Sequence, residues 1–250
     1  VFFQKNKYYH HHCNYISDES FSYDLSEIDK VFLTYNNRCK PHRFYLMYSM
    51  IKNNLLKDSL YSYTAIDSDV RYEENKTKIN WYFIDKGRVL LNESILKELQ
   101  SITGTKIITP EINGFGGDYY GQFLQIEDYK KTFVSVVTES TVGDNSIYFS
   151  EKTQKPLLAK HPFILVSSKG SLKKLKSYGF KTFDRWWDES YDECSYFIGR
   201  IDKISEIMKQ LQKKSKKELI QMREEMQEVL LFNHNLLQTY STTAICDVLK

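Results

Sequence analysis

Short runs of β-forming residues alternate with amphipathic helical patterns along this chain, and that alternation limits its fold more than any other feature. Residues 31–36 (VFLTYN) have the composition of a buried strand closed by a turn signal. Residues 42–56 then place apolar side chains at the spacing of one helix face, and residues 60–65 (LYSYTA) are a second strand candidate. This order predicts a βαβ unit.

The second half repeats the alternation more regularly. We expect strands over 132–139, 162–167 and, briefly, 181–183. The expected helices are 151–160 capped by Ser150, 171–180 closed by Gly179, a helix through residues 198–211, and a long last helix over 216–240. In the last helix, the residues expected to face inward are Leu219, Met222, Met226, Val229, Phe232 and Leu236.

Strands that alternate with helices predict an α/β fold with parallel sheets covered by helices. We predict two Rossmann-like lobes, an N-terminal lobe over residues 1–128 and a C-terminal lobe over residues 129–250. The glycine-rich residues 112–123 are interpreted as an ordinary connection between them, since no helical period follows. The chain begins at Val1, so an upstream segment of the first lobe is allowed for.

Composition narrows the function classes. With 41% hydrophobic residues the chain is expected to be globular, and its net charge of +3 does not by itself indicate a nucleic-acid partner. No apolar run reaches the roughly 18 residues of a membrane span. The four cysteines are scattered, which favours reduced thiols in a cytoplasmic protein.

Glu151 and Lys152 stand side by side where a helix is expected to begin. Free N–H groups and a partial positive charge at a helix start attract phosphate, and Lys152 adds a full charge. Glu151 cannot bind phosphate, but its carboxylate can accept hydrogen bonds from a ribose diol. The pair is therefore a candidate nucleotide-diphosphate site, and the alternative is an ordinary helix start with a solvated lysine.

The segment from Thr132 to Ser168 resembles the donor-binding segment of the alpha-1,3-fucosyltransferases and of the related exostosin-like group. Glu139 stands for the glutamate at that family's strand end, and Phe149-Ser150-Glu151-Lys152 for its aromatic-x-Thr-Glu-Lys element. The family's asparagine is Ser140 here, and its threonine is Ser150. The strings GFKTFDRWWDESYD and FLTYNNRCKPHRFYLMYSMIKNNLL resemble phage and giant-virus glycosyltransferases. The resemblance implies the two-lobe GT-B architecture, a nucleotide sugar held by the second lobe, and no bound metal or other cofactor.

Two other segments add candidate residues. Arg38, His42 and Arg43 lie between a strand and a helix, where they are either a cationic wall for the donor or surface charge. An inverting transfer needs a general base, for which Asp67 and Asp69 are the best placed and His42 is the alternative. Asp67-Ser68-Asp69 is also the pattern with which metal-dependent glycosyltransferases hold manganese.

Three further motifs have competing explanations. In DRWWDESYDE (184–193), Trp186 and Trp187 could stack on a sugar, while Ser190 or Asp192 could simply cap a helix. The histidines of HHHCN (10–14) cannot share one face, so they are interpreted as a surface run without metal. The basic residues 209–218 are interpreted as a helix junction.

The resemblance, taken together with the candidate residues, thus predicts a metal-independent, inverting glycosyltransferase. It would move a sugar from a UDP- or GDP-sugar to a hydroxyl of a glycan or another acceptor, with nucleic acid expected only as a modified acceptor. The alternative is a non-catalytic carbohydrate- or nucleotide-binding module of the same fold, which would bind a nucleoside diphosphate without turnover.

Overall fold

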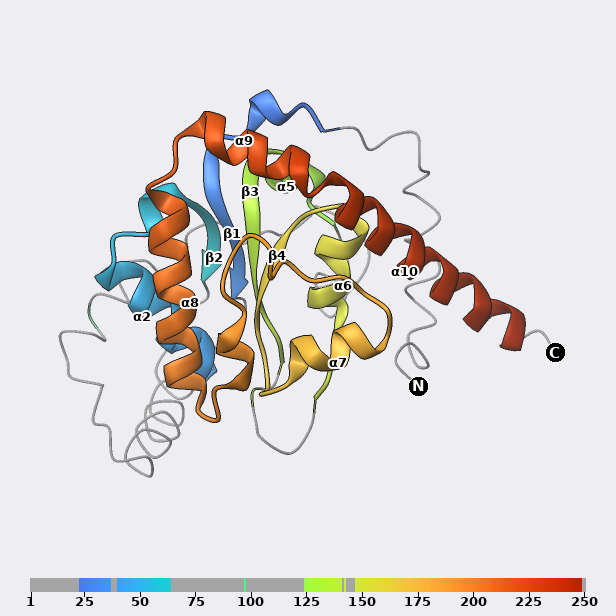
Figure 1. Cartoon of the computed structure of the whole chain (residues 1–250). Coiled ribbons are helices and arrows are strands. Elements are labelled where there is room, and N and C mark those ends of the chain that lie inside the picture. Colours follow the sequence, from blue (N-terminus) through green and yellow to red (C-terminus); the bar gives the residue numbers. More distant parts are fainter. Residues whose placement is uncertain are drawn as a thin grey trace, which may run out of the picture.

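The computed structural model describes residues 23–36, 40–63, 97, 124–140, 142 and 147–248. Its strands are β1 (Lys30–Asn36), β2 (Ser59–Tyr63), β3 (Thr132–Thr138) and β4 (Phe163–Val166). Its helices are α2 (Pro41–Lys52), α5 (Ile126–Lys130), α6 (Glu151–Leu158), α7 (Ser171–Ser177), α8 (Phe197–Gln212), α9 (Lys216–Glu225) and α10 (Gln227–Val248) (Figure 1). Short 3-10 turns are η2 (Leu25–Glu27), η3 (Leu56–Asp58) and η5 (Ser190–Glu193).

The four strands form one parallel sheet in the order β2-β1-β3-β4. Phe32 of β1 pairs with Ser59 on one side and with Val134 on the other. The predicted α/β class with a parallel sheet is therefore confirmed. Because β1 pairs directly with β3, the predicted boundary between residues 128 and 129 does not separate two sheets in the described part of the chain.

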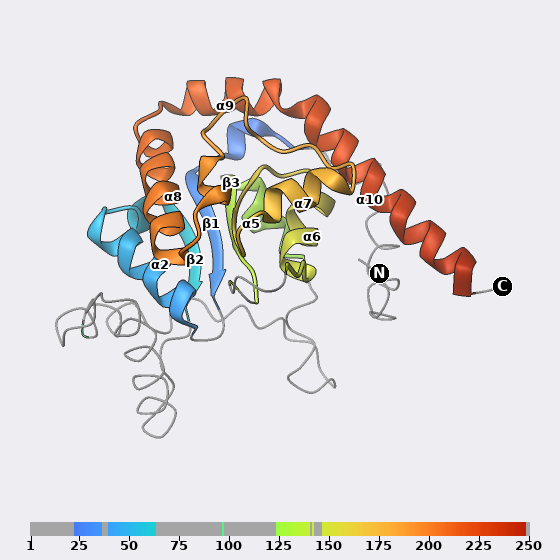
Figure 2. The same ribbon diagram turned by 60° about the horizontal axis from the view of Figure 1, so that its bottom comes forward.

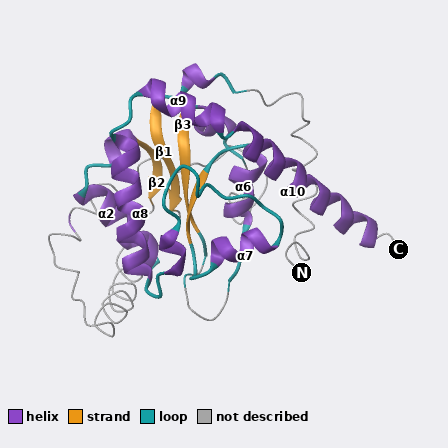
Figure 3. Ribbon diagram, viewed as in Figure 1, coloured by secondary structure: helices purple, strands orange, loops and turns teal. Residues whose placement is uncertain are grey.

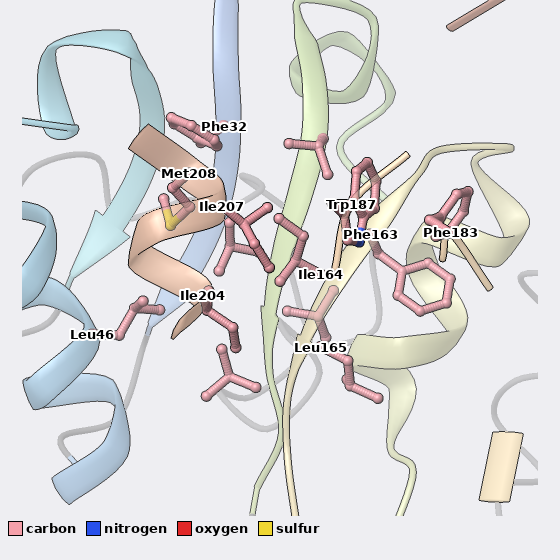
Figure 4. Packing of buried hydrophobic residues seen from close by; sticks show 14 of the residues in the cluster. Phe32, Leu46, Phe163, Ile164, Leu165, Phe183, Trp187, Ile204, Ile207 and Met208 are labelled. Atoms are coloured by element: carbon pink, nitrogen blue, oxygen red, sulfur yellow. The ribbon is translucent and has the colours of Figure 1, made fainter. Parts of the chain in front are cut away.

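Alternation along β1 sends neighbouring side chains to opposite faces of the sheet. Phe32 belongs to the large core, which α2 and α8 help to form through Leu46 and Met208, all three with no solvent exposure (Figure 4). Leu33 packs on the other face with Tyr129 of α5. The helices α2 and α8 lie side by side over the first of these faces (Figure 3).

The predicted long last helix is wrong in one respect, because it is two helices. Ser215 begins α9 with a capping box, and Met226 separates the end of α9 at Glu225 from the start of α10 at Gln227. Helix α9 crosses the end of the sheet at which β1 and β3 begin, whereas α10 packs against α6 and runs on outward (Figure 1). The two helices meet different partners, a difference that the continuous hydrophobic pattern does not reveal.

Two smaller predictions are also wrong. Residues 181–183 form no strand, because side chains occupy their backbone groups: Asn233 bonds the N–H and the C=O of Lys181, each at 2.8 Å, and Glu189 accepts the N–H of Phe183 at 2.8 Å. Phe232 faces outward with 41% exposure, where the ammonium of Lys181 lies 4.5 Å from its ring centroid.

Candidate functional site at the carboxyl edge of the sheet

The strand order reverses at the centre of the sheet, between β1 and β3. From β1 the chain passes through α2 to β2 on one side, and from β3 through α6 to β4 on the other. The arrowhead of β1 points to the edge at which α2 begins (Figure 2). In open parallel sheets, ligands bind outside the carboxyl ends of the strands at such a point. Here the two strand ends are joined by a 2.8 Å hydrogen bond from Thr138 Oγ1 to Asn36 Oδ1.

Glu139 follows β3 and has no solvent exposure. One of its carboxylate oxygens accepts hydrogen bonds from Ser150 N at 2.9 Å and Thr153 Oγ1 at 2.5 Å. The other accepts from Ser150 Oγ at 2.6 Å and Ser140 N at 3.1 Å. This buried anion stands at the start of α6, where the sequence predicts that phosphate meets helix N–H groups. The geometry gives Glu139 a positioning role and leaves it no open face toward a ligand.

Ser150 is the N-cap residue of α6, as predicted. Its Oγ accepts from Lys152 N at 3.3 Å while donating to Glu139, so one hydroxyl links β3 to the helix. The helix then continues through Pro156 to Leu158. The predicted start at Glu151 is therefore confirmed, and the capping geometry presents Glu151 and Lys152 at the carboxyl edge.

Glu151 and Lys152 form an ion pair with each other, and both side chains stay partly exposed, at 24% and 28%. Burial alone raises the pKa of Glu151, but the charge and hydrogen bond of Lys152 outweigh it and hold that pKa below its usual value. Lys152 Nζ also lies 3.4 Å from Ser140 Oγ and 3.3 Å from Ser150 Oγ. The pair is thus a partly exposed charged group beside Ser140, at the carboxyl end of β3.

Lys40 is a cation of the site that the sequence interpretation missed. Its Nζ donates to the carbonyl of Ser140 at 2.5 Å. Two ammonium groups, one from the start of α2 and one from the start of α6, therefore meet at Ser140. Lys40 immediately precedes α2, so it stands where the chain returns from the carboxyl end of β1. This position is the sequence signal that could have identified it.

His42 and Arg43 are buried, each with 3% exposure. His42 Nε2 donates to the carbonyl of Glu139 at 2.8 Å, and Arg43 NH2 lies 3.4 Å from the carbonyls of Thr138 and Glu139. Burial lowers the pKa of His42 to about 3, so its imidazole is neutral. A ring nitrogen committed to a backbone carbonyl does not suit the predicted base, and both side chains instead fix α2 to the end of β3.

Several predicted positions fall outside the described residues. They include the donor candidate Arg38, the base candidates Asp67 and Asp69, the histidine run 10–14 and the glycine-rich stretch 112–123. Within the described ranges, no group of three or more His, Cys, Asp or Glu side chains has the arrangement of a metal site. In the same ranges no helix is long and apolar enough to cross a membrane, and Cys194 is a free thiol.

The segment DRWWDESYDE is structural. Trp187 is buried at 6% exposure, and Trp186 Nε1 donates to Glu225 Oε2 at 3.2 Å. Asp192 caps α7, since its carboxylate oxygens accept from Leu172 N at 3.0 Å and Lys173 N at 3.1 Å. The capping alternative is thus the correct one for Asp192, although the helix it caps lies before it in the chain and not after it.

An open hollow of about 500 Å³ lies at the start of α7. Its lining residues are Lys169, Gly170, Lys173, Glu193 and Ser195. A Cβ on Gly170 would stand 3.8 Å from Ile147, which lies three residues before the N-cap Ser150. Gly170 on the wall of the hollow therefore approaches the segment that leads into α6.

Comparison with known proteins does not assign a family or a function to the chain. No family model, no curated protein and no solved structure matches the chain.

Proposed function

We propose that this protein is a nucleotide-sugar-dependent glycosyltransferase whose donor diphosphate binds between Lys40 and Lys152. The observation that carries the proposal is the convergence of these two ammonium groups on Ser140, at the direction change between β1 and β3. Two cations on a partly exposed strand end suit a ligand with two adjacent anionic groups. The family resemblance of the same segment supplies the reaction class.

Each residue has a distinct part in this proposal. Lys40 and Lys152 neutralise the diphosphate as it leaves, and charge stabilisation of that kind lowers the barrier when the groups are already in place. Glu151 turns from Lys152 to the ribose diol once the phosphates hold the lysine. Glu139 and Ser150 keep the start of α6 in position. The hollow at the start of α7 is the proposed room for the rest of the ligand.

The remaining features of the proposal come from the sequence. Asp67 or Asp69 deprotonates the acceptor hydroxyl, with inversion at the anomeric carbon, and Arg38 adds a further cation. In the same proposal the enzyme needs no metal, acts in the cytoplasm and uses a glycan or another hydroxyl compound as acceptor. Its proposed architecture is the two-lobe GT-B fold that the resemblance implies. A binding module of the same fold that lacks turnover is the competing possibility.

The test titrates UDP, GDP and the free nucleosides into variants of the two charged residues by calorimetry. Lys152→Ala is expected to weaken the diphosphate by about tenfold or more, because it removes a charge-assisted contact, and to leave the nucleoside unchanged. Glu151→Ala is expected to weaken the diphosphate and the nucleoside by similar factors, since both carry the ribose. A 2′-deoxy ligand should lose most of that sensitivity.

Lys209→Ala is the matched control, because this exposed lysine of α8 pairs only with Glu206 among the described residues. Unchanged affinity in both Lys152→Ala and Glu151→Ala would contradict the diphosphate site. Binding of UDP or GDP without hydrolysis or transfer of any common nucleotide sugar would favour the binding module over the enzyme.

A further inference from the structure

Helix α6 presents one charged face at the candidate site. Five of its eight residues are buried, and the remaining three are Glu151, Lys152 and Lys155. Residues three and four apart on a helix are neighbours, so Lys155 stands beside both Lys152 and Glu151. A single carboxylate is therefore shared by two ammonium groups on this face.

Among the residues that the structure describes, Lys155 has no hydrogen-bond partner of its own. No hydrogen bond joins its Nζ to another described residue, whereas Lys152 has Glu151, Ser140 and Ser150. Burial opposes the charged form of Lys155 and lowers its pKa to about 8, although Glu151 acts in the other direction. Glu151 is the one carboxylate beside Lys155 in the described part of the chain, and it is already paired with Lys152. A half-buried cation in this situation is poorly compensated until an anion arrives.

The charged and titratable groups on β3 and α10, the elements packed against α6, do not supply that anion. From the end of β3, the Glu139 carboxylate is fully occupied by Ser140, Ser150 and Thr153. From α10, His234 directs Nδ1 to the carbonyl of Leu158 at 2.9 Å. On α6 itself, only Glu151 opposes the two lysines.

We propose that Lys155 is a second α6 cation for the ligand diphosphate, placed one helical turn behind Lys152. This inference rests on the proposed diphosphate site and adds a residue that the sequence motif does not contain. When a diphosphate occupies Lys152 and Glu151 turns to the ribose, the ligand supplies the negative charge that Lys155 then lacks. The protonated form of Lys155 is then the form that binds.

The decisive readout is the pH dependence of affinity, because the lysine titrates within the working range. If only protonated Lys155 binds well, the apparent dissociation constant rises with the fraction of protein that has lost this proton. With a pKa of about 8, UDP or GDP should bind wild-type protein roughly fourfold more weakly at pH 8.5 than at pH 7.0. The matching free nucleoside reports any titration of the base.

Two variants separate charge from structure. Lys155→Arg stays protonated throughout this range, so its affinity should not fall between pH 7.0 and 8.5. Lys155→Met should bind the diphosphate about tenfold more weakly at pH 7.0 and show no pH dependence. Lys209→Met, at the far end of α8 from this site, should behave as wild type.

Each outcome decides between the two proposals. If UDP or GDP binds in a Lys152-dependent way but Lys155→Met binds as wild type, or if Lys155→Arg loses affinity with pH as wild type does, the role of Lys155 is wrong and the diphosphate site stands. If neither diphosphate binds wild-type protein, the proposed function itself is wrong. Circular dichroism and urea unfolding of each variant exclude loss of folding as the cause.

Discussion

At the scale of single residues, the carboxyl edge of the sheet contains two groups of side chains. One group holds the surrounding elements in position, and the other is accessible to a ligand. Glu139, His42 and Arg43 are buried and bond to the backbone or to hydroxyls, so they hold β3, α2 and α6 together. Lys152 and Glu151 stay partly exposed. The two groups differ in burial, which cannot be inferred from the sequence motif.

The neutral, buried His42 makes stability depend on pH. Its pKa is about 3 in the folded protein and about 6.5 in an unfolded chain. The unfolded state therefore binds the proton first as pH falls, and stability decreases from about pH 6.5 toward pH 3. For this one residue we expect a loss of about 2 kcal/mol between pH 7.5 and 5.0.

Urea unfolding of wild type and His42→Gln at both pH values measures this contribution. The variant should lose about 2 kcal/mol less than wild type over the same interval, because glutamine does not titrate. His161, which is also buried and has a pKa lowered well below its usual value by burial, remains in both proteins and contributes equally. Equal pH dependence in the two proteins would show that His42 is protonated or exposed.

At the scale of elements, two helices of the second half begin at a buried carboxylate from elsewhere in the chain. Glu139 serves α6, and Asp192 serves α7 from 19 or 20 positions away. In each case the carboxylate satisfies N–H groups that a helix start leaves without a partner. These anions fix where the helices start along the carboxyl edge.

Asp192→Asn tests this arrangement at α7. The change keeps the size of the side chain but removes its charge, and we expect a loss of about 1–2 kcal/mol in unfolding free energy. The matched control is Asp188→Asn, whose exposed carboxylate bonds only Ser190 among the described residues and should cost under about 1 kcal/mol. A loss no larger than that of the control would contradict a structural role for the Asp192 carboxylate.

At the scale of the whole molecule, the central pairing of β1 with β3 joins the two halves of the chain. The core is correspondingly continuous, with Phe32 of β1 and Ile164 of β4 in the same cluster and both without exposure (Figure 4). Elements that share a sheet and a core are expected to unfold together. The described elements should therefore melt as one unit.

Truncation of a core residue in each half tests that expectation. Phe32→Ala and Ile164→Ala should each lower the stability of the same single transition by about 3 kcal/mol, through lost burial and a new cavity. Leu231→Ala, at an exposed position of α10, should change it by less than about 0.5 kcal/mol. Two calorimetric transitions, each sensitive to only one of the core variants, would favour independent lobes.

The sequence by itself determined the local structure. Hydrophobic period and turn signals located the four strands within about two residues, and a serine before a helical pattern located the start of α6. These features depend on neighbours in the chain, so they can be inferred without a fold. The same local signals produced the false strand at 181–183 and the inward Phe232, where distant side chains decided the outcome.

Only the tertiary structure decided which elements meet. Strand order cannot be inferred from the hydrophobic pattern, because the same succession of strands and helices allows several parallel arrangements. The pairing of β1 with β3 brings Lys40 to Ser140, 100 positions away, and so places it near Lys152. Burial of Glu139 follows from the same packing. A sequence motif can therefore identify Glu151 and Lys152. The nearby cation Lys40 and the buried carboxylate of Glu139, which holds the start of α6, are identified only by long-range contacts.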